Sequence, residues 1–421
     1  MLDTQQLAAQ AVAKVGAGRN LNQVLDELRR ANPRLTPQQR AALQDLSYTT
    51  LRWLARLDAI LASLLQKPLT DERVRYLLLV AIGQLEYGKS APHAVVDHAV
   101  RAAAQFKQSW AGGLVNAVLR NFLRQREALV AAADRNVQTK LSYQKWWINK
   151  LRTQYPENWQ ALLSAGNDHP PMTLRVNLRK ISRDDYLARL AAQGMQAAAV
   201  GVAGIRLGRP VSVDKLPGFF DGLVSVQDLG AQMAALLLDV QDGMRVLDAC
   251  SAPGGKSAHL LELAEIELLA LDSDASRLKK VSDNLLRLGQ TATVREADAA
   301  RSDLWWDGRA FDRILADVPC SASGIVRRHP DIKWLRREAD IGSFAAQQTN
   351  ILQGLWSTLA KGGKLLYATC SVFHEENYQQ VEAFIANTPD VRRLALPGEE
   401  QGQLLPCDAH DGFFYAMLQK I

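Results

Sequence analysis

VLDACSAPGGKSAHLLEL, residues 246–263, runs from a short apolar strand through a glycine-containing turn into a helix. Gly254 and Gly255 let the backbone bend sharply and approach a ligand closely. The amide groups of the turn and the N-terminus of the helix together form an electropositive cradle. The turn matches neither the GxGxxG loop of dinucleotide-binding proteins nor the GxxxxGK[ST] loop that binds nucleotide phosphates. This stretch therefore predicts a βα unit with a ligand-binding turn, and nothing in it marks a pyrophosphate site.

The alternation of strand and helix continues from about residue 231 to the end of the chain. The other predicted strands are short apolar runs separated by helical stretches: IELLALDSD (266–274), ATVREAD (292–298), FDRILADVP (311–319) and GKLLYATCS (363–371). Strands that alternate with helices form parallel sheets with right-handed crossovers. We therefore expect residues 231–421 to form a doubly wound, Rossmann-like α/β domain.

Three aspartates stand at the carboxyl ends of successive predicted strands: Asp272, Asp298 and Asp317. An open α/β sheet binds its ligand in the crevice outside these strand ends, so the three acids share one site. Asp272 is placed to bind ribose hydroxyls, and Asp298 or its backbone can meet an adenine edge. An NAD-dependent dehydrogenase would need the missing GxGxxG loop, whereas S-adenosylmethionine carries no phosphate. The pattern therefore favours S-adenosylmethionine as the cofactor.

Two of the four cysteines fall at the ends of predicted strands. Cys320 follows the strand that carries Asp317, and Cys370 ends the next strand, so both should open into the cofactor crevice. Cys250 is expected to contribute backbone to the ligand turn, and Cys407 is expected to be structural. The chain contains no CxxC pair, which argues against a zinc site, and a reducing compartment disfavours disulfides.

Two thiols beside a methyl donor suit methylation at carbon 5 of cytosine. A thiolate that adds to carbon 6 makes carbon 5 nucleophilic, so that carbon 5 can take the methyl group. Asp317 is the candidate acid near N3, if it is protonated or shares a proton, and a second base must remove the C5 proton before the thiol leaves. The residues alone leave open which cysteine attacks. Arg327, Arg328 and Lys333, which follow Cys320, could lower a thiol pKa or hold RNA phosphates, and a solvated charged loop has the same composition.

A cysteine hydrolase is the competing interpretation of these thiols. It would need a histidine base, for which His329 and His374 are the candidates nearest in sequence. Neither histidine lies in a hydrolase signature, and a hydrolase would give the three strand-end aspartates no role.

Residues 1–140 are expected to form an all-helical domain. The segment LNQVLDELRR, residues 21–30, has apolar positions at i, i+3, i+4 and i+7, and similar patterns recur along this third of the chain. Prolines fall between the helical segments, at Pro33, Pro37, Pro68 and Pro92. Residues 141–230 then combine helices with short strands and predict a small α+β module.

The net charge of +6 is unevenly distributed along the chain. Residues 1–140 carry 19 Lys or Arg against 11 Asp or Glu, which gives +8 and leaves −2 for the rest. A basic appendage on a near-neutral body suggests a polyanionic partner. Charge alone leaves nucleic-acid binding and a merely solvated basic face equally open.

Several classes of protein are disfavoured by the sequence. No stretch of about 18 or more apolar residues is free of charge, and the N-terminus lacks the basic and apolar regions of a secretory signal. We therefore expect a cytoplasmic protein that does not enter membranes. Nothing indicates a metal site or demands an oligomer, so a monomer without metal is expected.

DACSAPGGK, ALDSD, EAD, DVPCSASG and YATCS resemble the successive motifs of the NOL1/NOP2/Sun family of RNA 5-methylcytosine methyltransferases. The match covers the C-terminal half, and the paired PCS and TCS motifs are highly specific. The helical third looks like a NusB-type RNA-binding domain, a combination that is similar to the bacterial Fmu/Sun branch of the family. The resemblance implies a cytosine-C5 RNA methyltransferase that uses S-adenosylmethionine, with 16S ribosomal RNA as its substrate.

The resemblance also implies roles for individual residues. Cys370 of the TCS motif matches the nucleophile, and Cys320 of the PCS motif matches the residue that assists release of the methylated base. Lys256 matches a lysine near the methyl-transfer site. The expected cofactor contacts are Cys250, Ser251, Ala252, Pro253, Gly254, Gly255, Lys256, Asp272, Asp298 and Asp317, together with Arg277. The expected RNA contacts are Arg175 and Asn177, which match an RxN element ahead of the catalytic domain, and Arg327 and Arg328.

Two other functions stay open on the sequence. One is a transfer RNA cytosine-C5 methyltransferase. The other is a NusB-like RNA-binding or antitermination factor whose methyltransferase domain is inactive. Retention of both cysteines and of all three strand-end aspartates argues against an inactive domain.

Overall fold

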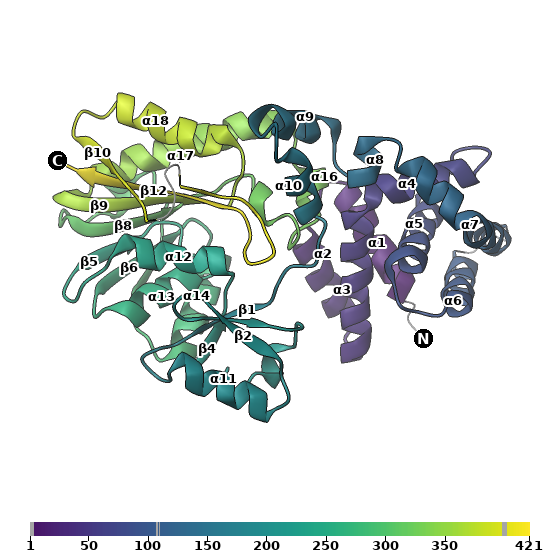
Figure 1. The fold of residues 1–421 in the computed structure, drawn as a ribbon, viewed down its shortest axis with the longest axis horizontal. Helices are drawn as coiled ribbons and strands as arrows, with labels where there is room; N and C mark the ends of the chain where they lie inside the picture. The colour runs from purple at the N-terminus through teal and green to yellow at the C-terminus, as the bar shows by residue number, and fades with distance from the viewer. Residues whose placement is uncertain (1–3, 107, 109, 398–401) are drawn as a thin grey trace. The chain divides into compact units, whose positions relative to one another are not determined.

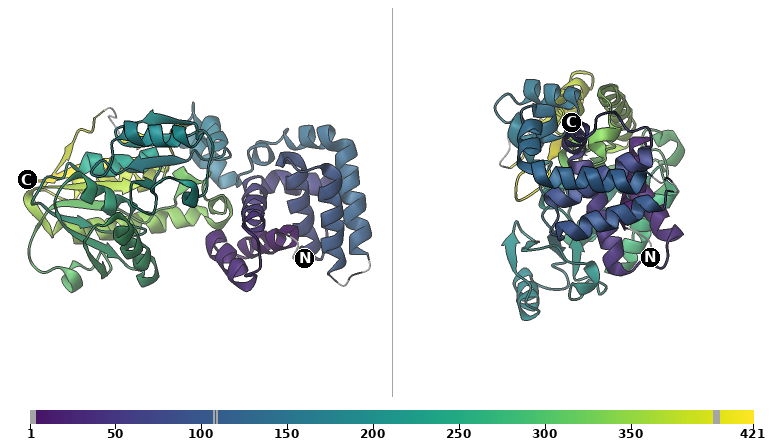
Figure 2. Two further views of the ribbon diagram at one scale, coloured as in Figure 1. Left: turned by 90° about the horizontal axis from the view of Figure 1, so that it is seen from below. Right: turned by 90° about the vertical axis from the view of Figure 1, so that its right-hand side faces the viewer.

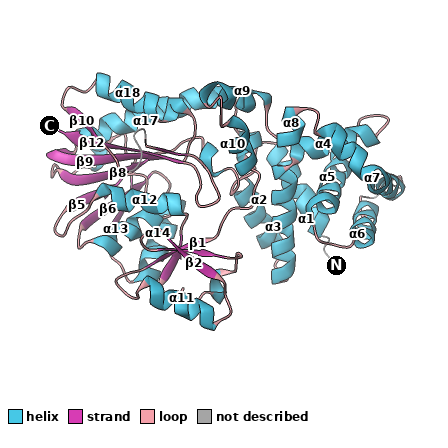
Figure 3. Cartoon of the chain, viewed as in Figure 1, coloured by secondary structure: helices cyan, strands magenta, loops and turns pink. Residues whose placement is uncertain are grey.

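The computed structural model of the chain describes residues 4–106, 108, 110–397 and 402–421 (Figure 1). Packing divides the chain into two units. The first comprises Met1–Asp168 together with Val326–Glu338, and the second comprises His169–Ile325 together with Ala339–Ile421. Within the described ranges, strands occur only in the second unit, as Figure 3 shows. None of the helices in these ranges combines the length and the apolar character that a bilayer crossing requires.

The first unit is a bundle of helices around α5 (Glu72–Tyr87), most of whose residues are buried. A helix that is apolar on every side belongs at the centre of such a bundle. Pro37 and Pro92 begin α3 (Pro37–Arg52) and α6 (Pro92–Ala104), where the missing proline N–H costs no hydrogen bond. The other helices before the connection to the second unit are α1 (Thr4–Gly16), α2 (Leu21–Ala31), α4 (Leu54–Leu64), α7 (Ala111–Ala133), α8 (Val137–Leu141), α9 (Lys145–Gln154) and α10 (Trp159–Ala165) (Figure 2). The predicted all-helical N-terminal domain is confirmed.

A distant segment completes this helical unit. Val326–Glu338, which contains α16 (Ile332–Leu335), belongs to it although the segment lies between Cys320 and Cys370 in the sequence. The Lys333 ammonium is fully buried and donates to the Arg52 carbonyl at 2.6 Å. The helical unit therefore does not end at residue 140, where the sequence predicts a boundary, because α9, α10 and this later segment pack with it.

The α+β module is a four-stranded antiparallel sheet of order β2-β3-β1-β4, with α11 (Arg183–Ala192) packed on it. Its strands are β1 (Thr173–Val176), β2 (Ala197–Val200), β3 (Gly204–Leu207) and β4 (Val224–Val226). Ser182 caps α11, as the sequence predicts. The sequence did not predict β2, because alanine is a poor strand former and pairing with β3 is what makes this segment a strand.

The α/β domain is built on an eight-stranded sheet of order β10-β12-β9-β8-β5-β6-β7, in which β11 pairs with β12. Its strands are β5 (Arg245–Asp248), β6 (Glu267–Asp272), β7 (Thr293–Glu296), β8 (Phe311–Asp317), β9 (Leu359–Thr369), β10 (Val391–Leu394), β11 (Gln403–Leu404) and β12 (Phe413–Lys420). The strands from β9 to β7 are parallel, whereas β10, β11 and β12 pair in antiparallel fashion. The predicted Rossmann-like class is confirmed, with a mixed sheet in place of the expected parallel one.

Helices cover both faces of this sheet. On one face α17 (Glu338–Trp356) and α18 (Tyr378–Ala386) pack against Leu365 and Tyr367. On the other face α12 (Leu229–Leu238) and α13 (Gly255–Leu263) pack against Leu366 and Ala368. Neighbouring residues of β9 thus point to opposite layers, as side chains of a strand must.

The order of the parallel strands fixes where a ligand can bind. The chain runs outward from β5 to β6 and β7 on one side, and β8 and β9 lie on the other side. A doubly wound sheet binds its ligand at this switch point, outside the carboxyl ends of the strands. The ends of β5, β6, β8 and β9 therefore define the site.

Candidate active site

The loop 250–256 joins β5 to α13 at the switch point of the sheet. The Ala252 amide donates to the Asp272 carboxylate at 3.2 Å, which ties the loop to the end of β6. Gly254 has a φ of +94°, and a Cβ at this position would lie 3.0 Å from Val281 Cα. Only glycine fits there, so this part of the glycine turn is required by the backbone itself.

Asp272 and Arg277, two of the predicted cofactor residues, form hydrogen bonds with the loop 250–256. Asp272 is 3% exposed at the end of β6. Arg277, on α14 (Ala275–Leu288), donates to the Ala252 carbonyl at 3.0 Å and lies 3.6 Å from an Asp272 oxygen. The loop is therefore held in shape by the same residues that the sequence assigned to the cofactor.

The third strand-end acid faces the loop lysine. Asp317, at the end of β8, forms an ion pair with Lys256. Lys256 Nζ also lies 5.5 Å from the centre of the Phe413 ring in β12. Asp298 lies farther along this edge, exposed beyond β7, where its carboxylate accepts from the Ala300 amide at 2.9 Å.

The donor and acceptor groups around the loop fit the nucleoside and amino acid of S-adenosylmethionine. Ser251 Oγ and Asp248 Oδ1 are buried, and neither has a hydrogen-bond partner among the described residues. Buried polar atoms are nearly always satisfied, so this unmet capacity suits a polar ligand. Asp272 and Asp298 add carboxylate acceptors at neighbouring strand ends, which is what ribose hydroxyls and an adenine amino group require.

The two cysteines of the predicted site meet at the ends of β8 and β9. Their Sγ atoms lie 3.4 Å apart, and the Gly324 amide donates to the Cys370 carbonyl at 2.8 Å, which ties the two loops together. The hydrogen bond with Cys370 and burial raise the pKa of the Cys320 thiol well above its usual value. The structure thus brings together the two sulfurs that strand order alone placed at one crevice.

Cys250, Cys407 and the candidate base His374 have surroundings that differ from those of this cysteine pair. Burial raises the pKa of the Cys250 thiol, so it stays protonated at neutral pH, while Cys407 is exposed. The ring of His374 packs edge-on against Tyr378, with 4.7 Å between ring centres, and burial lowers the pKa of this histidine.

Known proteins match this chain over its whole length. Residues 235–419 match the family described as 16S rRNA methyltransferase RsmB/F, residues 143–214 match its ferredoxin-like domain, and residues 2–124 match the NusB family. Ribosomal RNA small subunit methyltransferase B of Pseudomonas putida is 45% identical over 98% of this chain and 98% of its own length. The chain belongs to the ribosomal RNA small subunit methyltransferase B family.

Further matches agree with membership in the methyltransferase B family. The protein of that name from Escherichia coli O127:H6 is 42% identical over 99% of this chain and 98% of its own length. The solved structure of a methyltransferase homolog protein from Pyrococcus horikoshii is 28% identical, covers 68% of this chain and 97% of its own length, and has a TM-score of 0.60. As a member of the methyltransferase B family, the chain is an S-adenosylmethionine-dependent RNA methyltransferase.

The structure corrects two RNA contacts predicted for this member of the methyltransferase B family. Arg175 is 0% exposed: its guanidinium pairs with Glu262 of α13 at 2.7 Å and donates to the Gly255 carbonyl at 2.8 Å. Asn177 is also buried and donates to the Gly222 carbonyl at 3.3 Å. The expected contacts with RNA are wrong for both residues, because their polar groups face protein partners in the interior. Arg175 instead supports the loop 250–256, called the cofactor loop below, through its hydrogen bond to the Gly255 carbonyl.

The predicted phosphate contacts after Cys320 also need correction. Arg327 and Lys333, which belong to the helical unit, are almost completely buried, so neither can meet a phosphate at the surface. Burial also lowers the pKa of Lys333 well below its usual value. Arg328 is partly exposed, and its RNA contact stays a prediction.

Two buried carboxylates near the site were missed by the sequence reasoning. Asp248, at the end of β5, accepts from the Ser257 hydroxyl at 2.6 Å, and burial raises its pKa to about 7. Glu376 accepts hydrogen bonds from both cysteine loops. Both acids stand inside the motifs VLDAC and TCSVFHEEN, but no spacing rule separates a buried carboxylate from a solvated one.

Proposed function

We propose that this enzyme methylates carbon 5 of a cytosine in 16S ribosomal RNA through a covalent bond between Cys370 and carbon 6, with Cys320 assisting release. The observation that carries the proposal is the pair of thiols, 3.4 Å apart, near the strand end that carries the Lys256–Asp317 ion pair. One thiol suffices to activate a pyrimidine, whereas a second thiol serves the step that frees the product. The choice of 16S RNA is supported by the family description and by the names of the relatives.

The first half of the reaction uses Cys370 and Asp317. Bound S-adenosylmethionine supplies an electrophilic methyl group, and the residues that would hold it are the loop 250–256, Asp272, Arg277 and Asp298. The Cys370 thiolate adds to carbon 6, and the electron pair of the former double bond becomes available at carbon 5 for the methyl group. Asp317 pairs with the Lys256 ammonium, and this pair offers a proton donor that offsets the negative charge developing near N3.

The second half of the reaction uses Cys320. Once the Cys370 sulfur is bound to carbon 6 it is neutral, so the main cause that raises the pKa of Cys320 disappears. Cys320 then loses its proton to solvent and accepts the proton from carbon 5. The carbon 5 electron pair re-forms the double bond to carbon 6, and the Cys370 thiolate leaves.

Single alanine variants of the two cysteines test these roles. Cys320→Ala should accumulate a covalent RNA–protein adduct on a denaturing gel, because methyl transfer proceeds while release stalls. Cys370→Ala should give neither adduct nor methylated RNA in an assay with unmodified 16S RNA and radiolabelled cofactor. The reverse pattern would exchange the two roles. Wild-type incorporation into transfer RNA alone would identify a transfer RNA enzyme, and no incorporation into any RNA would leave an RNA-binding factor with an inactive domain.

We further propose that α7 of the helical unit contacts RNA phosphates. Arg120 and Arg124 lie one helical turn apart on an exposed face, where they donate to the side chains of Asn116 and Asn121. Neither arginine has a carboxylate partner among the described residues. Two uncompensated guanidinium groups at this spacing are suited to successive phosphates.

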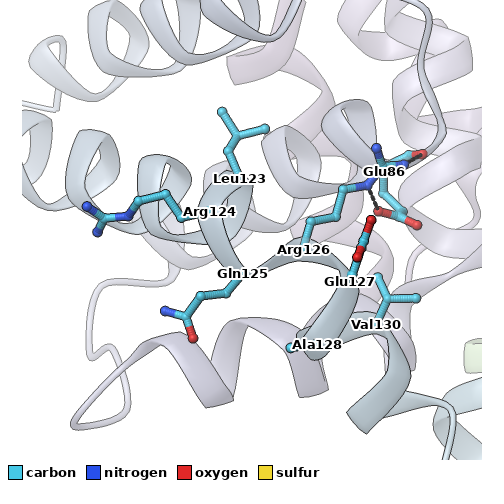
Figure 4. A pocket seen from close by; sticks show the side chains of 8 residues that line it. All are labelled: Glu86, Leu123, Arg124, Gln125, Arg126, Glu127, Ala128 and Val130. Carbon is cyan, nitrogen blue, oxygen red and sulfur yellow. Dashed lines mark hydrogen bonds and ion pairs between the residues drawn. The ribbon is translucent and has the colours of Figure 1, made fainter.

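A neighbouring arginine supplies the matched control for this face. Arg126 lines the hollow beside α7 and pairs with Glu86 at 2.8 Å, while Arg124 projects away from that pair (Figure 4). Replacing Arg120 and Arg124 with alanine should weaken RNA binding and reduce its salt slope by about one per lost contact. Arg126→Ala should change affinity far less. An unchanged salt slope in the double variant would make this helix a scaffold or a protein-binding face.

A further inference from the structure

Glu376 is a buried carboxylate that the mechanism above does not use. It lies in η3 (His374–Glu376) and is 0% exposed. Its oxygens accept from the Ser321 amide at 2.7 Å, from the Ser321 and Ser371 hydroxyls at 2.5 Å each, and from the Gln348 side-chain amide at 3.3 Å. Every one of these donors is neutral, and no cation pairs with Glu376 in the described part of the chain. The carboxylate is therefore buried without charge compensation.

The hydrogen bonds of Glu376 reach both catalytic loops at equivalent places. Ser321 directly follows Cys320, and Ser371 directly follows Cys370. The two serine hydroxyls also lie 3.2 Å from each other, within hydrogen-bond distance. One side chain is thus hydrogen-bonded to the residue next to each sulfur, and the two sulfurs lie 3.4 Å apart.

The energetic cost of this arrangement argues that the charge has a function. Burying a carboxylate without a cation is unfavourable, and burial raises the pKa of Glu376 while the serine hydrogen bonds oppose that rise. A neutral side chain would fill the same space at lower cost if only packing were needed. After Cys370 and burial, Glu376 is a further cause of the raised pKa of Cys320.

We propose that Glu376 is the positioning residue of the cysteine pair: its hydrogen bonds to Ser321 and Ser371 hold the two loops in register, with the two sulfurs at the separation that the reaction uses. This inference rests on the proposed roles of the two cysteines.

Selective alkylation tests the inference without RNA or cofactor. The full-length protein is treated with limiting iodoacetamide at mildly alkaline pH, and labelling of Cys320 and Cys370 is measured by mass spectrometry of the peptides. The thiolate is the reactive form, so each labelling rate reports the surroundings of its own sulfur, and the raised pKa of Cys320 should make Cys320 slow to label in the wild type. Glu376→Gln should bring the ratio of the two labelling rates down at least about fivefold, because the charge that favours a proton on Cys320 is gone.

Kinetics on the same variant give the second readout. Glu376→Gln should lower kcat by about 10- to 100-fold, because a small displacement of a reacting group is costly. The KM for S-adenosylmethionine should stay within about twofold, because the loop 250–256 does not touch this carboxylate. Glu382→Gln, which removes the same charge from an exposed position on α18, should keep both the wild-type kcat and the wild-type labelling ratio.

The outcomes separate this inference from the proposed reaction. An unchanged labelling ratio overturns the inference, even if kcat falls, because the surroundings of the two sulfurs would then not depend on Glu376. Should Glu376→Gln fail to fold, Ser371→Ala removes one of its donors: a changed labelling ratio together with a several-fold fall in kcat supports the inference, and a wild-type labelling ratio overturns it. Failure of the wild-type protein to methylate any RNA would sink the proposed reaction and leave the labelling ratio to be judged on its own.

Discussion

The loop before α13 and the loops that carry the two cysteines are both held from behind by a buried glutamate, but the two glutamates have different partners. Glu262 faces the guanidinium of Arg175, which itself reaches the Gly255 carbonyl of the cofactor loop. Glu376 faces only hydroxyl and amide groups next to the cysteines. The loop 250–256 is thus stabilised by the Arg175–Glu262 ion pair, whereas the two cysteine loops are hydrogen-bonded to a carboxylate that has no cation partner in the described part of the chain.

The difference follows from what each half has to do. The cofactor loop needs only a fixed shape, and an ion pair with extra hydrogen bonds gives shape without a local net charge. The cysteine loops take part in proton transfers in the proposed reaction, and a nearby buried charge shifts the pKa of a thiol. The two buried glutamates of this site therefore differ in partners as the loops that they hold differ in task.

The largest expected effect comes from breaking the neutralised pair. Arg175→Met leaves Glu262 buried without its cation and should lower the free energy of unfolding by about 3–5 kcal/mol, measured by urea denaturation. Arg179→Met, which breaks the exposed Arg179–Glu265 pair nearby, should cost no more than about 1 kcal/mol. Equal losses in the two variants would mean that burial does not distinguish these pairs.

A smaller effect is expected from Asp248, the buried acid at the foot of the cofactor loop, because its pKa is raised to about 7 by burial. Above that pH the folded chain carries a buried charge that is solvated in the unfolded chain, and below about pH 4 neither state carries it. Asp248→Asn should therefore raise the free energy of unfolding by on the order of 2 kcal/mol at about pH 8, and this gain should vanish as the pH falls toward about 4. Asp221→Asn, at an exposed position, should show no such dependence. A gain that grows on acidification would contradict the raised pKa.

The smallest change in stability is expected when both members of the pair are replaced. Arg175→Met combined with Glu262→Leu removes both buried charges and should return the free energy of unfolding to within about 1 kcal/mol of the wild type. Affinity for S-adenosylmethionine, measured by calorimetric titration, should stay reduced because the Gly255 carbonyl has lost its Arg175 donor. Full recovery of affinity would show that the ion pair supports the fold and not the loop.

Much of the fold could be predicted because it depends on local patterns. Alternating apolar strands and helices predicted the doubly wound domain, and the glycine turn at residues 246–263 located its ligand edge. The antiparallel strand β12 was not predicted, because nothing in FFYAMLQK states which neighbour it pairs with or in which direction. The sequence also could not predict that Val326–Glu338 belongs to the helical unit, because this depends on packing between segments far apart in the sequence.

The candidate site could be predicted where a residue follows a strand end, and not where burial decides its role. The meeting of Cys320 and Cys370 followed from strand order. Arg175 was misread because an arginine in an RxN element gives no sign of facing a glutamate nearly ninety positions later, at Glu262. Glu376 was passed over for the same reason, since its partners become visible only when the two cysteine loops are folded together.

The packing of residues 326–338 with the helical unit has a consequence for the evolution of the gene. Lys333 there donates to the Arg52 carbonyl, and Asp331 accepts from the Leu21 amide at 3.0 Å at the start of α2. A gene fragment that ends at residue 168 encodes a helical unit that lacks Asp331 and Lys333. The complementary fragment encodes these two residues without Leu21 and Arg52, to which they are hydrogen-bonded. A single recombination event between the two units would therefore damage both products. We expect the two units to be inherited together in one gene.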